Sequence, residues 1–508
     1  MGSKKLFFNF NMILRDIKMH WPIWVMALAG YTLMCTAVVA VGTFRSLDYD
    51  YDIVIEVVEI LADTNHFFAA ALGIVIAVAS FGYLTKKRKH YFFESLPFNR
   101  LSLFATRYLF GVIVFMIPLI SIYVIEIIQT TMHGYFGIWE LTQWLIVATT
   151  ECLFWFSVGV IVLVICGRIG MAGFCYIALA TVWMLFKTVI EVYSEILYVG
   201  VKSGLGWFET STYNILSPIE FFTDMSPKMS LDISGPGDVY PEGTFIKVLM
   251  ALAVVMILTA GAMLLYNRRK SEKTDDNLVF PAVKIIFSWA FAFFCALGFG
   301  IMFIALFISA ESGQAHMTSN KIGIMVIILI LGFVGYMASC MIVEKKFRVF
   351  SQNMVKCGIF LAVLAVFMIG MFCDVFNIEK FVPDKNDCTY ANISGEYSLT
   401  GEYTNYRSYS KAGIGKTVEL LQIVIDNFDD VCVNEDDYFG HSTKRLQIHL
   451  SMKEGYLNRT YYIPEYSTLD EKVTEFMREN IGLYTDGYVR YYEDDSMYEY
   501  EGSSYYYD

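Results

Sequence analysis

Residues 109–128 read LFGVIVFMIPLISIYVIEII and hold a single charged side chain, Glu126, in a run long enough to cross a lipid bilayer. Similar runs recur along the 508-residue chain, which is 56% hydrophobic and 17% charged, whereas soluble proteins carry about 25% charged residues. A soluble chain of this length buries a core without repeating such runs. The sequence therefore predicts an α-helical polytopic membrane protein.

Apolar length alone predicts nine membrane helices. They fall at 22–43, 66–84, 104–130, 141–166, 170–190, 245–266, 283–308, 322–343 and 355–376. Lys and Arg collect before the first helix and after the second, fourth, sixth and eighth. Because cytoplasmic loops retain positive charge, this alternation predicts a multi-pass protein of the cell membrane. Its N-terminus would be cytoplasmic and its C-terminal region extracytoplasmic.

The regions outside the helices have patterns of their own. Within residues 1–21, Phe10, Ile13 and Ile17 recur at helical spacing beside polar residues, which predicts an amphipathic helix on the inner membrane surface. Residues 22–266 then form a six-helix block, and residues 267–376 add three helices.

The C-terminal region is acidic and rich in Tyr. From residue 377 onward it holds 12 basic and 25 acidic residues, a net charge of −13 against −12 for the whole chain. We expect a small α+β domain over 377–487 and a disordered tail over 488–508. The predicted elements are strands at 417–425, 446–452 and 459–463 and a helix at 468–481, capped by Ser467 or Thr468.

Motifs of catalysis are weak in this chain. The segment Gly413–Thr417, GIGKT, ends like a phosphate-binding loop, but the glycine that such a loop needs is replaced by Ser410. A turn entering a strand is the better interpretation. Neither HExxH, nor GxSxG, nor a Cys/His cluster with metal-ligand spacing occurs. We therefore expect no enzyme activity, and no metal or cofactor bound by this chain.

Two carboxylates lie inside predicted membrane helices. Glu126 is in the third helix and Glu151 in the fourth. Charged groups in a bilayer are costly and often functional, so the two are candidates for an intramembrane polar site. The alternative for each is a solvated or hydrogen-bonded group near the interface.

The loop between the second and third predicted helices, Lys86–Tyr108, reads KKRKHYFFESLPFNRLSLFATRY. It resembles the corresponding segment of membrane (permease) subunits of type-2, exporter-class ABC transporters, in which a Glu-x-Leu-Pro-x-x-Arg-like motif forms the coupling helix that docks into the ATPase. The resemblance implies that the coupling residues here are Glu94, Leu96, Pro97, Asn99, Arg100 and Phe104. The alternative is a basic loop that obeys the positive-inside rule and needs no partner.

Three further features resemble the type-2 layout: the N-terminal surface helix, the six-helix block and the long external loop Glu191–Thr244. The segment Leu446–Pro464 is also similar to a C-terminal extracytoplasmic domain found on some such permeases of low-GC Gram-positive bacteria. The three helices over 267–376 depart from the basic family pattern, and their role stays open.

The resemblance implies a permease subunit that exports an amphipathic cargo, such as a peptide antibiotic or a lipid-like molecule. ATP and Mg²⁺ would bind a separate cytoplasmic ATPase subunit, and a second permease copy or a paralogue would complete the complex. No basic surface suited to nucleic acid is present. The alternative is a membrane-anchored sensor or adaptor whose external domain binds a ligand or an envelope partner.

Overall fold

The computed structural model describes residues 10–45, 53–95, 99–132, 137–202, 214–227, 240–241, 243–307, 318–375, 377–397, 404–428, 431, 443–453, 455–480 and 484–486. The chain divides into two compact units. Unit 1 holds Met1–Ile190, Thr210–Phe307 and Ile322–Ile369, and unit 2 holds Glu191–Glu209, Ile308–Lys321 and Gly370–Asp508. The predicted tail at 488–508 lies outside the described residues.

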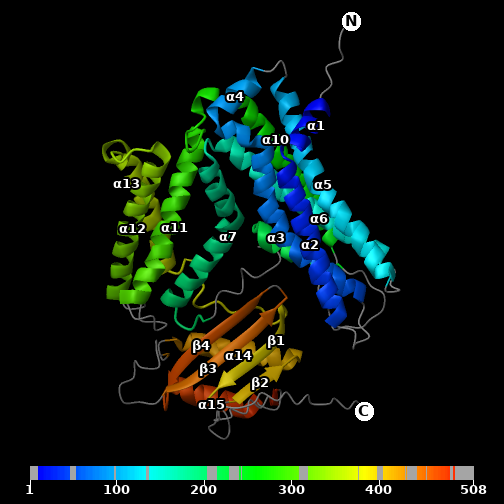
Figure 1. Cartoon of the computed structure of the whole chain (residues 1–508). Coiled ribbons are helices and arrows are strands. Elements are labelled where there is room, and N and C mark those ends of the chain that lie inside the picture. Colours follow the sequence, from blue (N-terminus) through cyan, green and yellow to red (C-terminus); the bar gives the residue numbers. More distant parts are fainter. Residues whose placement is uncertain are drawn as a thin grey trace. The chain divides into compact units, whose positions relative to one another are not determined.

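Unit 1 is helical (Figure 1). Eight helices in the described ranges are long and apolar enough to cross a membrane. They are α3 (Ile53–Phe81), α5 (Arg100–Met132), α6 (Ile138–Ile165), α7 (Ile169–Leu197), α10 (Thr244–Arg268), α11 (Pro281–Phe307), α12 (Thr318–Glu344) and α13 (Phe350–Phe372). The chain is therefore a multi-pass membrane protein. Helix α2 (Trp21–Arg45) occupies the first predicted position, but its apolar stretch, Trp24–Ala37, is shorter. The count of nine crossings thus stays a prediction.

Helix α3 begins thirteen residues before its predicted start at residue 66. Apolar length places the start too late, because the first part of α3 carries Glu56, Glu59 and Asp63 among buried aliphatic residues such as Val58 and Leu61. Residues 53–65, which lie between the first two predicted helices, are therefore helical.

Helices α3 and α6 form the closest pair in unit 1, and α6 is the most buried of the candidate spans. Two glycines permit this approach. A Cβ on Gly73 would lie 2.9 Å from Trp155 Cβ, and a Cβ on Gly159 would lie 2.8 Å from Ala77 Cβ. Close backbone approach through small residues is the usual way for membrane helices to associate.

Helix α1 (Phe10–Met19) lies where an amphipathic helix is predicted before the first membrane helix, and its position on the inner membrane surface stays a prediction. Ile13 is buried and Phe10 is exposed. The helix packs against α5, so its apolar face is covered in part by protein.

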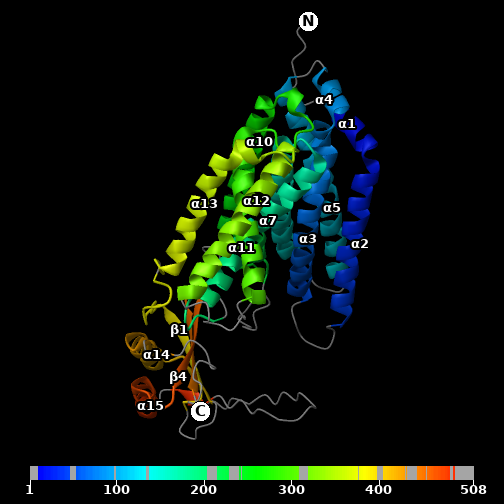
Figure 2. The ribbon, with the colours of Figure 1, turned by 90° about the vertical axis from the view of Figure 1, so that its left-hand side faces the viewer.

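Unit 2 contains a five-stranded antiparallel sheet with the order β4-β3-β1-β2-β5, and helices α14 (Lys411–Asp426) and α15 (Thr468–Asn480) lie on one side of it (Figure 2). The strands are β1 (Cys388–Gly395), β2 (Thr404–Ser408), β3 (Thr443–Met452), β4 (Tyr456–Pro464) and β5 (Thr485–Asp486). Alternate strand residues such as Ile393 and Ile448 are fully buried, so one face of the sheet forms the core with the two helices.

The strands predicted at 446–452 and 459–463 are confirmed and pair as the β3–β4 hairpin, and the predicted helix is confirmed as α15. The amide of Asp470 donates to Ser467 Oγ at 3.1 Å, which makes Ser467 the helix cap. Strands β1 and β2 were not predicted, because polar residues interrupt both of them.

The predicted strand at 417–425 is wrong, because these residues belong to α14. Ile414, Thr417, Leu421 and Val424 are buried at helical spacing. The GIGKT segment is therefore the first turns of this helix and not a turn entering a strand.

Ser410 caps α14 by accepting a hydrogen bond from the amide of Gly413 at 3.1 Å. We expect Ser410→Ala to lower the free energy of unfolding of unit 2 by about 1 kcal/mol, because an orphan helix amide loses its acceptor. Hydrogen exchange of the first turn of α14 would report the change. The control is Lys416→Ala, which removes an exposed ion pair with Glu419 and the approach of Nζ to the Phe476 ring at 5.8 Å, but leaves the cap in place. Equal exchange in the two variants would contradict the capping role.

Candidate functional site

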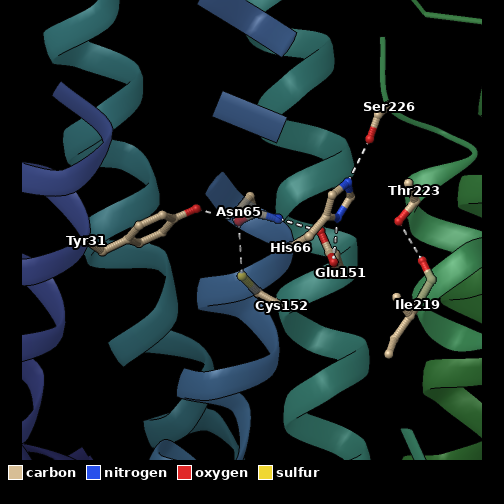
Figure 3. Close-up of polar contacts among 8 residues, drawn as sticks. All are labelled: Tyr31, Asn65, His66, Glu151, Cys152, Ile219, Thr223 and Ser226. Atoms are coloured by element: carbon tan, nitrogen blue, oxygen red, sulfur yellow. Dashed lines mark hydrogen bonds and ion pairs between the residues drawn. The ribbon is translucent and has the colours of Figure 1, made fainter. Parts of the chain in front are cut away.

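A buried polar cluster lies at the middle of α6, where Glu151 meets two neighbouring residues of α3 (Figure 3). Asn65 Nδ2 donates to Glu151 Oε2 at 2.5 Å, and His66 Nδ1 lies 2.8 Å from Glu151 Oε1. Glu151 is 2% exposed. Side chains of consecutive helix residues point about 100° apart. Asn65 and His66 can therefore each contact one oxygen of the same carboxylate only because Glu151 projects between them.

The cluster continues to both sides of the Glu151 carboxylate. Toward α2, Tyr31 donates its hydroxyl proton to Asn65 Oδ1, and Cys152 Sγ lies 3.8 Å from the same oxygen. Away from α2, His66 Nε2 lies 2.7 Å from Ser226 Oγ, just after the short helix α9 (Pro218–Thr223). Hydrogen-bonded side chains thus connect α2, α3, α6 and the segment that follows α9.

A small cavity adjoins the cluster, and two hydrogen-bond donors beside it lack partners. The cavity measures about 10 Å³, and Trp144, His66, Ser226 and Tyr240 contribute to its lining. Trp144 Nε1 and Tyr240 Oη are buried, and neither has a hydrogen-bond partner among the described residues. A volume of this size holds about one water molecule, and a water could accept from both donors.

The order Ser226–His66–Glu151 is that of a proton relay, with an imidazole between a hydroxyl and a carboxylate. His66 can pass a proton between its two partners without moving, since each ring nitrogen already contacts one of them. Ser226 is 6% exposed, and the adjoining cavity has no room for an organic substrate. The arrangement therefore suits proton or water exchange and not acyl transfer.

Glu126, the other predicted intramembrane carboxylate, lies near the C-terminal end of α5. It is fully buried, and neither of its carboxylate oxygens has a hydrogen-bond partner within the described part of the chain. Its surroundings thus differ from those of Glu151, which is fully hydrogen-bonded.

The predicted coupling residues are distributed over the end of α4 (Lys87–Glu94) and the start of α5. Leu96 and Pro97 lie outside the described residues, and Glu94 is the last residue of α4. Asn99 Oδ1 accepts from the amide of Leu101 at 3.4 Å. The short helix α4 thus ends before Pro97.

Two of these residues contact the rest of unit 1. Arg100 Nη1 donates to the carbonyl oxygens of Asn267 and Arg269 at 3.4 and 3.3 Å. Phe104 is 2% exposed, and its ring centroid lies 5.2 Å from that of Phe81. In this conformation Phe104 is therefore a packing residue at the base of α5 and not a surface residue.

A group that we name the anchor cluster, Asp16, Tyr83, Phe93 and Arg107, holds α4 and α1 against α5. The Arg107 guanidinium lies 2.8 Å from Asp16 Oδ2, and both side chains are at most 2% exposed. Arg107 also lies over the Phe93 ring at 4.6 Å and over the Tyr83 ring at 5.5 Å. Burial raises the pKa of the Asp16 carboxyl, and Arg107 opposes this shift. One buried cation thus joins α1, α4 and α5.

Arg269, nearby, joins the C-terminal end of α6 to Leu84. It is 2% exposed and donates to the carbonyl oxygens of Leu163 and Val164 at 2.8 Å and of Cys166 at 3.1 Å, at the C-terminal end of α6. It also donates to Leu84 O at 2.8 Å. A cation at this position satisfies carbonyls that have no intrahelical partner.

Sequence reasoning selected Glu151 but missed its partners. Asn65 directly precedes the predicted start of the second helix, His66 is one of seven scattered histidines, and Ser226 lies in a long loop. No family model, no curated protein and no solved structure matches this chain.

Proposed function

We propose that this chain is the permease subunit of an ATP-binding cassette transporter that exports an amphipathic cargo, with ATP and Mg²⁺ bound by a separate cytoplasmic ATPase. The chain itself supplies no catalytic residue for ATP hydrolysis. A second permease copy or a paralogue faces the second ATPase.

The proposed topology has nine crossings in the cell membrane, with α2 as the first. It rests on the alternation of basic and acidic connections. The connection between α3 and α5 is then cytoplasmic, and the part of unit 2 that follows α13 is extracytoplasmic.

The observation that carries the proposal is the exposure pattern of α4. His90 and Phe93 are buried, while Tyr91 and Phe92 are 52% and 51% exposed. Residues 86–89, KKRK, are exposed as well. Exposed aromatic side chains are typical of the centre of a protein interface, and charged side chains are typical of its rim. The other face of the same helix is held by the anchor cluster. Such a helix can bind a partner and transmit its movement.

The contacts around α4 indicate the route of transmission. A shift of α4 displaces Phe93, which moves Arg107 of α5, and Asp16 of α1 must follow because leaving a buried charge unpaired is costly. By analogy with the family, we expect the cargo path among the first, second and fifth helices. The Tyr31–Asn65 hydrogen bond links the first two of these, so it is expected to break when the path opens.

Docking can be tested with Tyr91→Ala/Phe92→Ala in the purified complex with a candidate ATPase. We expect roughly thirtyfold weaker ATPase binding, since two central aromatic contacts are lost, together with loss of ATPase stimulation. Glu94→Ala and Arg100→Ala should reduce stimulation while the complex stays intact.

The matched control for docking is Phe347→Ala, which truncates an 87% exposed aromatic residue between α12 and α13. Unchanged binding by the Tyr91→Ala/Phe92→Ala variant, or an equal loss in the control, would count against docking through α4.

A row of rings on unit 2 favours the alternative function, a sensor or adaptor. Tyr409, Tyr390, His449 and Tyr456 follow one another with centroid distances of 4.9, 6.1 and 5.7 Å. Tyr409 is 76% exposed, and such a row can stack against a planar or sugar-like ligand. A chain that binds an envelope ligand through this row and stimulates no ATPase would favour the sensor.

A further inference from the structure

An apolar groove runs between α7 and α11 in unit 1. Its volume is about 500 Å³, within the range of ligand-binding pockets. Phe174, Val182 and Leu185 line it from α7, and Phe291, Gly298 and Met302 are among the residues of α11. Both sets repeat at helical spacing, so each helix presents one continuous stripe to the groove.

The two helices run side by side in the same direction along this groove. Phe174 lies near the start of α7, and its ring centroid is 5.9 Å from that of Phe287, near the start of α11. From Phe174 to Leu185 the shared lining extends about 16 Å at 1.5 Å per residue. One leaflet of the hydrocarbon core is about 15 Å thick, so the groove matches the length of one lipid tail.

The end of the groove where α7 and α11 begin carries an excess of positive charge. Lys284 precedes Phe287 by less than one helical turn, and Arg168 immediately precedes α7. Asp275 pairs with Arg168 at 3.0 Å, and Asp276 lies 3.8 Å from Lys284. Lys345 donates to the carbonyl oxygen of Asp275, so three cations face two carboxylates. A negatively charged lipid headgroup would neutralise the excess positive charge.

We propose that this groove binds one acyl chain of an anionic membrane lipid, with the lipid headgroup beside Lys284 and Arg168. The proposal does not depend on the transport function, since it rests only on the groove and its charged end. It gives α11, one of the three additional helices, a role: α11 turns the face of α7 into a lipid site.

Headgroup charge must supply the selectivity of such a site. Lipid tails are as apolar as the groove, so moving a tail from the bilayer into it gives no hydrophobic gain. The groove instead accommodates the shape of one acyl chain, and the cations attract the headgroup of an anionic lipid. We therefore expect preference for a headgroup and tolerance of different tails.

The proposal can be tested by photolabelling the full chain in nanodiscs. The probes are phosphatidylglycerol and phosphatidylcholine that carry the same diazirine on one acyl chain. We expect the phosphatidylglycerol probe to label α7 and α11 peptides at the groove, with competition by unlabelled phosphatidylglycerol. Gly298→Phe should reduce this labelling at least tenfold, because a side chain there enters open space in the groove.

The control for filling the groove is Gly358→Phe on α13, where a Cβ also meets no atom within 4 Å. Lys284→Gln should weaken competition by phosphatidylglycerol about fivefold, the effect of one cation near an anionic lipid, whereas Lys356→Gln on α13 should not. A melting profile of each variant verifies folding. Labelling spread evenly over all lipid-facing helices, or equal labelling by the two probes, would overturn the proposal.

Discussion

Replacing Arg107 by Met is expected to lower the free energy of unfolding by about 3–5 kcal/mol, the usual cost of removing one partner from a buried ion pair. Asp16 would lose its ion-pair partner Arg107, and the Phe93 and Tyr83 rings would lose the cation above them. Burial already raises the pKa of Asp16. Without Arg107 the carboxyl takes up a proton, which limits the loss. Denaturation in detergent micelles and hydrogen exchange of α1 and α4 would measure the effect.

Two further variants separate pairing from general damage. Asp16→Leu/Arg107→Met should recover much of the loss, because neither side then leaves a buried charge. Arg168→Met removes the half-exposed partner of Asp275 and should cost at most about 1 kcal/mol. A loss from Arg107→Met that is no larger than the loss from Arg168→Met would show that the anchor cluster does not hold α1 and α4.

The second large effect is expected for Glu151→Leu, which should also destabilise unit 1 by about 3–5 kcal/mol. Asn65 Nδ2 and His66 Nδ1 would both lose their acceptor in a buried part of the bundle. Glu151→Gln restores only part of the loss, since its amide presents one acceptor and one donor to two donors. Thermal unfolding in lipid nanodiscs would rank the three proteins.

Glu126 supplies the matched control for Glu151. Its carboxylate has no hydrogen-bond partner among the described residues, so Glu126→Leu should leave stability unchanged or raise it. Losses of similar size in Glu126→Leu and Glu151→Leu would mean that burial alone, and not the cluster, determines the cost.

Apolar length was a good guide to the helices of unit 1 and a poor guide to their ends. The predicted second helix began at residue 66 because a hydropathy pattern stops at acidic residues, although Val58 and Leu61 continue the buried face. That error removed Asn65 from the membrane and concealed the cluster.

Residue spacing was ambiguous in unit 2 for a different reason. The segment 417–425 mixes branched and straight apolar residues that suit a strand or a helix, and the cap on Ser410 and tertiary packing decide for α14. Contacts between distant segments, such as Ser226 with His66 and Asp16 with Arg107, leave no signature in one sequence, because they depend on how helices pack.

Arg269 has a consequence for motion. The Arg269 guanidinium donates hydrogen bonds to the last carbonyls of α6 and to the carbonyl of Leu84, which follows α3. The backbone of Arg269 follows the end of α10. At this end the three helices are therefore joined and move as one rigid block. Any large rearrangement in unit 1 then has to pivot about that block. Away from that block, Glu151 still joins α6 to Asn65 and His66 of α3, so these two helices move as a pair.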